Sequence, residues 1–320
     1  MIDASGAGKE NDGVRLLCVP ITQPFAEECV RVLRGARDLV GQALTLPPGA
    51  ELPAAGVFRA ETATLAALRA STKQEARQAL HSLALDGGNL AWLNAVDHIR
   101  ALEHDILMQP PPVWSPLSLA RAALEGCALT HYLWEGSIGL PLRLARVTSL
   151  RVREAQYEAK ASAVTWPEGQ AAAQARLAEA EQLASAAGAI VEKKTQRSKK
   201  VIKGYRVDGA YAPLDFTISE RINAFMPSWV PPSSYSLLSG AAHSRPWVIN
   251  RARTEQPDEW AGEAATVMTA AVIALGALDA ALATWSGFFG VNVEAALKDL
   301  ETMRDQFFRD AIMLAHHDGR

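Results

Sequence analysis

The sequence predicts an all-α protein, a multi-helix bundle with a weakly structured N-terminal segment. Alanine and leucine recur together with arginine and glutamate from about residue 57 onward, and runs of β-branched residues are few. Proline clusters at Pro47–Pro48, Pro110–Pro112 and Pro231–Pro232 separate the periodic stretches. Hydrophobic residues make up 49% and charged residues 21% of the 320 positions, which suits a soluble globular protein with a large core. We therefore expect a single helical domain over residues 57–320, after a partly disordered extension over residues 1–56.

The N-terminal extension opens on a polar stretch, MIDASGAGKENDG, without the apolar segment of a signal peptide. We expect a disordered lead-in there. Its GAGKE is not a phosphate-binding loop, because Glu10 follows Lys9 where such a loop needs serine or threonine. The sequence also allows short, minor strands near residues 14–20 or 201–207. The expected helices lie near residues 24–43, 59–84, 88–108, 117–135, 140–162, 168–192, 217–226, 233–244, 258–286 and 293–316.

The longest apolar stretch covers residues 264–289, AATVMTAAVIALGALDAALATWSGFF, and is long enough to cross a membrane. It is rich in alanine and carries Asp279 in its interior. An aspartate at the middle of a membrane costs about 2.5–3.5 kcal/mol, which alanine does little to offset. We therefore expect a buried core helix and no membrane partner.

The segment EKKTQRSKKVIKGYR, residues 192–206, carries seven basic residues and one acid. Such a segment is either a solvated loop between helices or an arm that contacts phosphate. Because Tyr205 is its only aromatic residue, the sequence favours the loop.

Charges are scarce in PLSLARAALEGCALTHYLW, residues 116–134, where Arg121 and Glu125 are the only ones. Small or apolar residues occupy nearly every side of this helix, so we expect it to be buried on most sides. The two ions lie four residues apart and therefore on one face. Burying them is costly unless they are paired, so they form either a structural ion pair or the lining of a polar pocket.

The following helix places Arg143, Arg146 and Arg153 within about 80° of arc, at 100° per residue. If this face meets the preceding helix, Glu125 gains a second partner. Several arginines around one carboxylate would leave donors for an anion such as phosphate. The alternative is a solvent-exposed face.

The stretch YSLLSGAAH, residues 235–243, lies between Arg221 and Arg245 without any other charged side chain. Tyr235, Ser239 and His243 are spaced by four and form one polar stripe. A histidine in the last turn feels the negative end of the helix dipole, so a protonated imidazole there can bind an anion or act as a general acid. The alternative is a histidine that only bonds the last carbonyl groups of the helix.

Other reaction signatures are missing from the sequence. It has no nucleophile elbow, no H-E-x-x-H and no glycine-rich dinucleotide turn. Three cysteines are too few for a disulfide framework or a zinc knuckle. We expect neither a metal nor a cofactor, and a cytoplasmic location.

Residues 88–250 resemble a broad set of uncharacterised, all-helical bacterial proteins. The similarity lies in LARAALE, in the arginine-bearing helix after it, and in YSLLSGAAH. A more distant resemblance is to HEPN-type helical proteins, many of which are metal-independent ribonucleases in toxin–antitoxin and phage-defence systems. Their R-x4-6-H motif matches RDAIMLAH, which makes Arg309 and His316 secondary candidates.

Two functions therefore remain open. The first is a HEPN-like protein that acts on RNA or binds a nucleotide, with arginine stabilising charge and histidine transferring a proton. The second is a non-catalytic helical protein that assembles, as a homodimer for example, or recognises a partner. For the first function the expected catalytic residues are Arg121, Glu125 and His243, and the expected substrate-binding residues are Arg143, Arg146, Tyr235 and Ser239.

Overall fold

The computed structural model confirms an all-α, multi-helix fold with one small sheet. It describes residues 21–45, 51–110, 112–196, 199–215, 217–231, 233–245 and 263–317, with the side chains of the last helix described as far as residue 310. The predicted lead-in and the predicted strand over 14–20 lie outside these residues.

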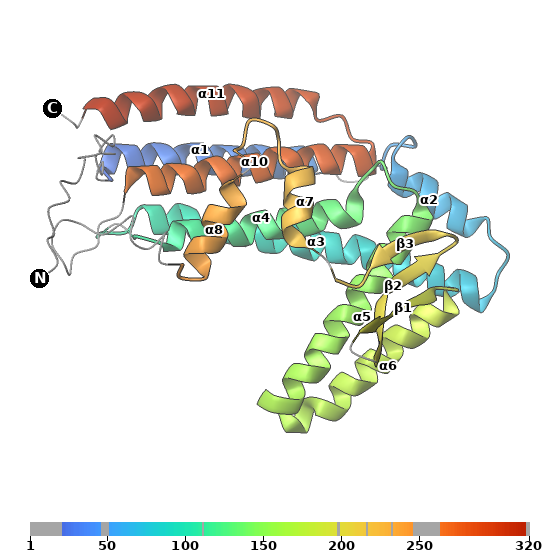
Figure 1. Cartoon of the computed structure of the whole chain (residues 1–320). Helices are drawn as coiled ribbons and strands as arrows, with labels where there is room; N and C mark the ends of the chain where they lie inside the picture. Colours follow the sequence, from blue (N-terminus) through green and yellow to red (C-terminus); the bar gives the residue numbers. More distant parts are fainter. Residues whose placement is uncertain are drawn as a thin grey trace, which may run out of the picture.

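Long helices form a layered bundle, as Figure 1 shows. The helix α11 lies outermost, α1 and α10 form the middle layer, and α3 and α4 lie beneath them. The apolar stripes of these helices interlock in one continuous core. The bounds of the bundle helices are α1 (Gln23–Leu44), α3 (Thr72–Ile106), α4 (Ser115–Trp134), α10 (Ala264–Phe289) and α11 (Glu294–His317).

The helix α1 belongs to this core, which corrects the predicted domain boundary at residue 57. Phe25, Val32 and Leu33 are buried in the same cluster as residues of α10 and as Phe307 of α11. The proline pair at 47–48 suggested a boundary, but burial of the α1 stripe ties it to the rest of the chain.

The helix α3 runs without a break through Gly87 and Gly88, where the sequence predicts two helices. Ser71 caps its first turn by accepting a hydrogen bond from the Gln74 amide at 3.2 Å. A Cβ atom on Gly88 would lie 2.3 Å from Nε1 of Trp134. The glycine therefore makes room for this indole, whose Nε1 donates to the Ala84 carbonyl at 3.1 Å.

The apolar helix α10 is the core helix that the sequence predicts. By length and composition it could span a membrane, but 61% of its most apolar 18-residue window is buried inside the protein. It ends at Gly290, whose φ of 73° is the left-handed conformation typical of glycine after a helix.

Three short helices complete the bundle. The helix α2 leads into α3, whereas α7 and α8 cross α4 on the side away from α3. Proline residues precede α8, as expected for a helix start after Pro231. The bounds are α2 (Val57–Ala66), α7 (Ile218–Phe225) and α8 (Ser234–Ala242).

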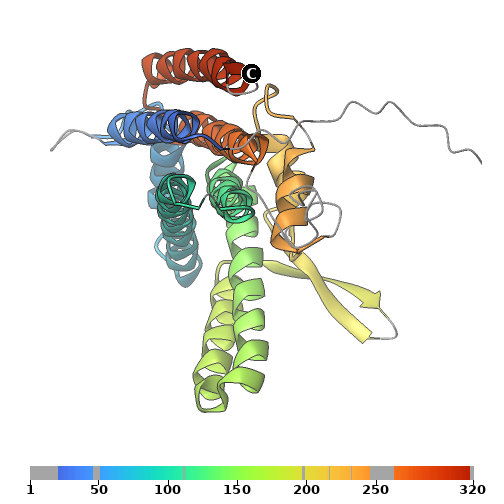
Figure 2. The same ribbon diagram turned by 90° about the vertical axis from the view of Figure 1, so that its left-hand side faces the viewer.

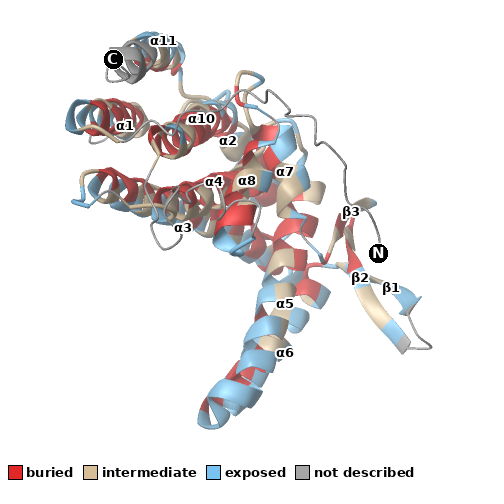
Figure 3. Cartoon of the chain, turned by 60° about the vertical axis from the view of Figure 1, so that its left-hand side comes forward, coloured by how far each residue is buried: buried red, intermediate tan, exposed pale blue. Residues whose placement is uncertain are grey.

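An arm, residues 150–215, projects from the bundle, as Figure 2 shows. The first turns of α5 are packed in the bundle, and its remainder pairs with α6 and a three-stranded antiparallel sheet of order β1-β2-β3. Its own core is small and comprises Val152, Ala184, Tyr205 and Leu214. Figure 3 accordingly shows far more exposed surface on the arm than on the bundle. The bounds are α5 (Leu140–Thr165), η1 (Pro167–Gly169), α6 (Gln170–Ala186), β1 (Ile190–Gln196), β2 (Lys199–Val207) and β3 (Ala210–Pro213).

The basic segment 192–206 forms the β1–β2 hairpin, so the predicted interhelical loop is wrong. Val191 pairs with Tyr205 and Lys194 with Val201 across the two strands. The predicted strand over 201–207 is confirmed as part of β2. Tyr205 and Val207 bury their side chains against the helices, which anchors the base of the hairpin.

Candidate functional site

Arg121, Glu125 and Tyr235 form a contact between α4 and α8. Arg121 Nε donates to Glu125 Oε1 at 2.7 Å, and the Tyr235 hydroxyl donates to the same oxygen at 3.0 Å. The Arg121 guanidinium also lies 5.6 Å from the centre of the Tyr235 ring. The predicted pairing of Arg121 with Glu125 is therefore present, and the stripe on α8 reaches it through Tyr235.

This contact is only half-buried, with 18% of the Arg121 side chain and 34% of the Glu125 side chain exposed. Burial, with added effect from the charge of Glu125, raises the pKa of Tyr235, so the phenol stays protonated and remains a donor. Arg121 and Tyr235 both donate to Glu125, as expected of a polar link between two packed helices.

His243 lies at the far end of α8 and is exposed. Eight residues separate it from Tyr235, a rise of about 12 Å along the helix. Its backbone N–H donates to the Ser239 carbonyl at 3.0 Å. Among the described residues no contact joins His243 to Arg121 or Glu125, so the expected catalytic trio is not assembled. Ser239 is half-buried between the two ends of the stripe.

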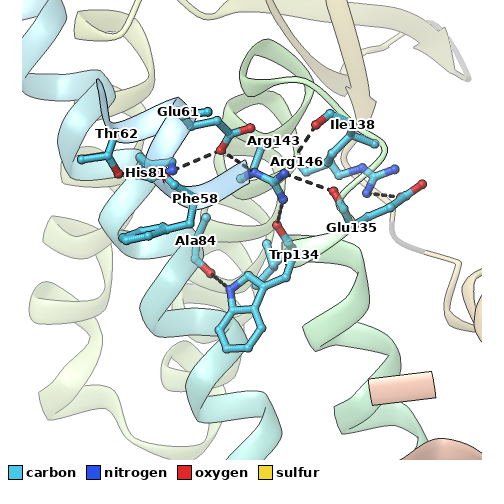
Figure 4. A network of polar contacts seen from close by, with 12 residues as sticks. Phe58, Glu61, Thr62, His81, Ala84, Trp134, Glu135, Ile138, Arg143 and Arg146 are labelled. Atoms are coloured by element: carbon cyan, nitrogen blue, oxygen red, sulfur yellow. Dashed lines mark hydrogen bonds and ion pairs between the residues drawn. The ribbon is translucent and has the colours of Figure 1, made fainter. Parts of the chain in front are cut away.

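Arg143 and Arg146 do not gather around Glu125, which corrects the predicted arginine cluster. Arg143 Nε donates to Glu61 Oε2 at 2.8 Å, and Arg146 Nη1 donates to Glu135 Oε2 at 2.7 Å (Figure 4). The reason is the tight connection from α4 to α5, which brings the start of α5 against the last turn of α4. Glu125 lies ten residues before Glu135, about 15 Å away along the helix.

The guanidinium of Arg143 is completely buried, and each of its three nitrogens donates a hydrogen bond. Besides Glu61, it donates to the Leu133 carbonyl and, at 3.1 Å, to the Glu135 carbonyl. It also lies 4.5 Å from the centre of the Phe288 ring. Burial lowers the pKa of Arg143, and the charge and hydrogen bond of Glu61 oppose that shift.

Glu61 and His81 complete this buried network, and sequence reasoning missed both. His81 Nε2 lies 3.1 Å from Glu61 Oε2, and the imidazole stacks on the Phe58 ring with 5.4 Å between ring centres. The signal that could have found them is a polar side chain in an otherwise apolar run. Glu61 begins the run ETATLAAL, and His81 lies within QALHSLAL. The network joins α2, α3 and α5 to the end of α4, and its burial leaves no room for a phosphate beside Arg143.

A different set of cations lines an open pocket on the arm. The pocket measures about 340 Å³ and lies between α5 and the hairpin. Cationic side chains approach it from both walls, and Tyr157 is 55% exposed beside it. Its lining residues are Arg153, Gln156, Tyr157, Lys160, Lys194, Val201, Ile202, Leu214 and Asp215. We name this site the arm pocket.

Comparison of the chain with known protein families, with curated proteins and with solved structures gave no match. The resemblance to HEPN-type proteins therefore stays a prediction. The chemistry of the arm pocket has to be judged from its own residues.

Two cations of the arm pocket lie around the Tyr157 ring. The Arg153 guanidinium lies 5.3 Å and the Lys160 ammonium 5.9 Å from the centre of its ring. Lys160 and Lys194 are both exposed, and neither forms an ion pair within the part of the chain that the structure describes. The arrangement can hold an anion and offer an aromatic face to a planar group.

The HEPN-type candidates lie apart from this pocket. Arg309 is exposed on α11, where its Nη2 donates to Gln306 Oε1 at 2.8 Å. The side chain of His316 lies outside the described residues. Nor do the described histidine, cysteine, aspartate and glutamate side chains include a group of three or more that could hold a metal ion.

Proposed function

We propose that the protein binds single-stranded RNA in the arm pocket, with the bundle as a rigid support. The arm pocket itself carries the proposal, because it places the exposed lysines Lys160 and Lys194 beside an exposed aromatic ring. Proteins that bind single strands combine a positive groove along the phosphates with aromatic rings on which bases stack. Tyr157 offers the ring, and Lys160 and Lys194 offer the charge.

The charge of the hairpin extends the same site. Residues 192–206 carry seven basic residues and a single acid, although the whole chain has a net charge of −3. A local positive patch on an otherwise acidic protein attracts phosphates without attracting them to the bundle. Asp215 at the pocket adds an acceptor for the N–H groups of a base.

The proposal is binding and does not extend to cleavage. The residues expected to cleave RNA do not meet, because no described contact joins His243 to Arg121 or Glu125. The arginines first expected to hold phosphate, Arg143 and Arg146, are committed to Glu61 and Glu135.

A groove on the bundle favours the second function, assembly of two copies. It lies between α1 and α3, measures about 630 Å³ and includes Trp92, Leu93 and Val96. Leu93 is 54% exposed, and Leu90 nearby on α3 is 66% exposed. Exposed leucines on one helix are typical of contacts between chains.

The test of RNA binding measures the fluorescence anisotropy of a labelled oligouridylate. The wild type is compared with Tyr157→Ala and with the double variant Lys160→Ala/Lys194→Ala. Loss of the ring removes base stacking of about 1–3 kcal/mol, an affinity loss of about 5- to 150-fold. Loss of both lysines should also weaken binding relative to the wild type, most strongly at low salt, because two phosphate contacts disappear.

The matched control is Lys298→Ala, an exposed lysine on α11. It removes the same kind of charge from the bundle and should leave the affinity within twofold of the wild type. A loss from Lys298→Ala equal to the loss from Lys160→Ala/Lys194→Ala would overturn the arm pocket as the site. Absence of RNA binding, with a dimer in light scattering that Leu93→Ser converts to monomer, would favour assembly.

A further inference from the structure

A second cavity lies on the bundle between α4, α7 and α10, away from the arm pocket. It measures about 700 Å³, a size common for small-molecule sites. Its titratable lining groups are His131, Glu135 and Asp279, none of which is among the site residues expected from the sequence. The lining residues are His131, Glu135, Gly136, Ser137, Ala224, Phe225, Pro227, Asp279, Ala280, Ala283, Thr284 and Gly287. We name this site the bundle cleft.

His131 presents an unprotonated nitrogen, as the hydrogen bonds around it require. The Thr284 hydroxyl donates its one proton to the Ala280 carbonyl at 2.8 Å, so Thr284 Oγ1 accepts from His131 Nδ1 at 2.9 Å. Burial, with added effect from Arg146 and Arg221, lowers the pKa of His131 and keeps the imidazole neutral. A neutral imidazole that carries its proton on Nδ1 has a lone pair on Nε2.

The two carboxylates that line the bundle cleft, Glu135 and Asp279, also accept hydrogen bonds. Ser137 donates its hydroxyl proton to Glu135 Oε1 at 2.7 Å. Trp229 Nε1 donates to Asp279 Oδ2 at 3.3 Å. Since the hydroxyl protons of Ser137 and Thr284 are both used, the described side chains that line the cleft offer acceptors to a ligand and no spare O–H donor.

The charge of the bundle cleft selects a cation. Glu135 and Asp279 are the charged residues among its described lining, and the cleft lies at the end of α4, the negative end of a helix dipole. Arg146 pairs with Glu135 at 2.7 Å from outside the lining, so Asp279 carries the charge that a ligand in the cleft meets. Burial raises the pKa of Asp279, whereas the Trp229 hydrogen bond and the charge of Arg304 lower it and so favour the carboxylate.

We propose that the bundle cleft binds a small primary amine, whose ammonium group donates hydrogen bonds to Asp279 and to His131 Nε2. An ammonium brings three donors and one positive charge, which are the two properties that the lining lacks. Gly287, where an added Cβ would meet nothing within 4 Å, leaves space beside these groups, and the Phe225 ring, 5.3 Å from the His131 ring centre, lines the same cleft for the carbon chain of the ligand. This proposal is independent of RNA binding in the arm pocket.

Calorimetric titration of the wild type with 1,4-diaminobutane tests the proposal, with 1,4-butanediol as the neutral counterpart. The diamine should bind and the diol should not. Asp279→Asn keeps an acceptor for Trp229 but removes the charge, and should weaken diamine binding about tenfold or more. His131→Asn keeps a donor toward Thr284 and removes Nε2, and should weaken binding as well.

The control variant is Asp299→Asn, which removes an exposed carboxylate of α11 and should leave the affinity unchanged. A second check needs no variant and measures how the diamine affinity of the wild type changes with pH. This affinity should fall as acid protonates Asp279 and His131. Absence of diamine binding, equal binding of the diol, or an Asp279→Asn affinity equal to that of the wild type would each overturn the proposal.

Discussion

The two halves of α5 carry the same kind of side chain and use it in opposite ways. Near the start of the helix, Arg143 is buried against Glu61 and backbone carbonyls. Two to five turns later, Arg153 and Lys160 surround an exposed tyrosine at the edge of an open pocket. The difference shows that the surroundings of a cation, more than its place on a helix face, decide whether it stabilises the fold or remains available to a ligand.

The largest effect that would test this contrast is expected from Arg143→Met. The change leaves Glu61 buried without its main partner, which costs about 3–5 kcal/mol of unfolding free energy. Urea denaturation followed by circular dichroism measures that loss. Lys194→Ala on the arm is the comparison, and its effect should stay within about 0.5 kcal/mol.

A second variant distinguishes a lost ion pair from lost packing. Adding Glu61→Leu to Arg143→Met removes the uncompensated charge and should recover part of the stability. If the double variant were as unstable as the sum of the two single variants, Arg143 would act through its packing on Phe288 rather than through its charge.

A smaller effect is expected from the outer end of the same network, at Glu135. Burial raises the pKa of Glu135, but the hydrogen bonds from Ser137 and Arg146 outweigh it and leave the pKa below its ordinary value. A carboxylate with a lowered pKa adds stability above its unfolded-state pKa, and this stability is lost as the pH falls through the folded-state value.

Glu135→Gln should therefore be less stable than the wild type at neutral pH, by about 1 kcal/mol. The difference should shrink as the pH falls below about 4, where the wild type also loses the charge. Thermal unfolding of both proteins across this range measures it. A difference that stays constant with pH would show that the Glu135 charge does not contribute.

The bundle could be predicted because its signals are local. Scarce charge in 116–134 predicts the buried helix α4, and the spacing of Arg121 and Glu125 predicts their ion pair. Asp279 in an alanine-rich stretch predicts a core helix, which α10 is.

The partners of the arginines could not be predicted, because they depend on how distant segments meet. Glu61 and His81 come from two other helices, and Arg143 meets Glu61 because the turn after α4 places the start of α5 there. The hairpin was missed because lysines and other polar residues occupy most of its positions, so its sequence lacks the alternation of apolar and polar residues that indicates a strand. The arm pocket follows only from the hairpin lying beside α5.

The salt dependence of RNA affinity tests the central claim, that the open cations of the arm and not the buried arginines bind the ligand. Anisotropy titrations of the wild type and of Lys160→Ala/Lys194→Ala between about 50 and 200 mM salt give the slope of log affinity against log salt. We predict a slope shallower by about 1.4 in the double variant, since each phosphate contact with a single strand contributes about 0.7. Equal slopes and equal affinities for the two proteins would contradict the account.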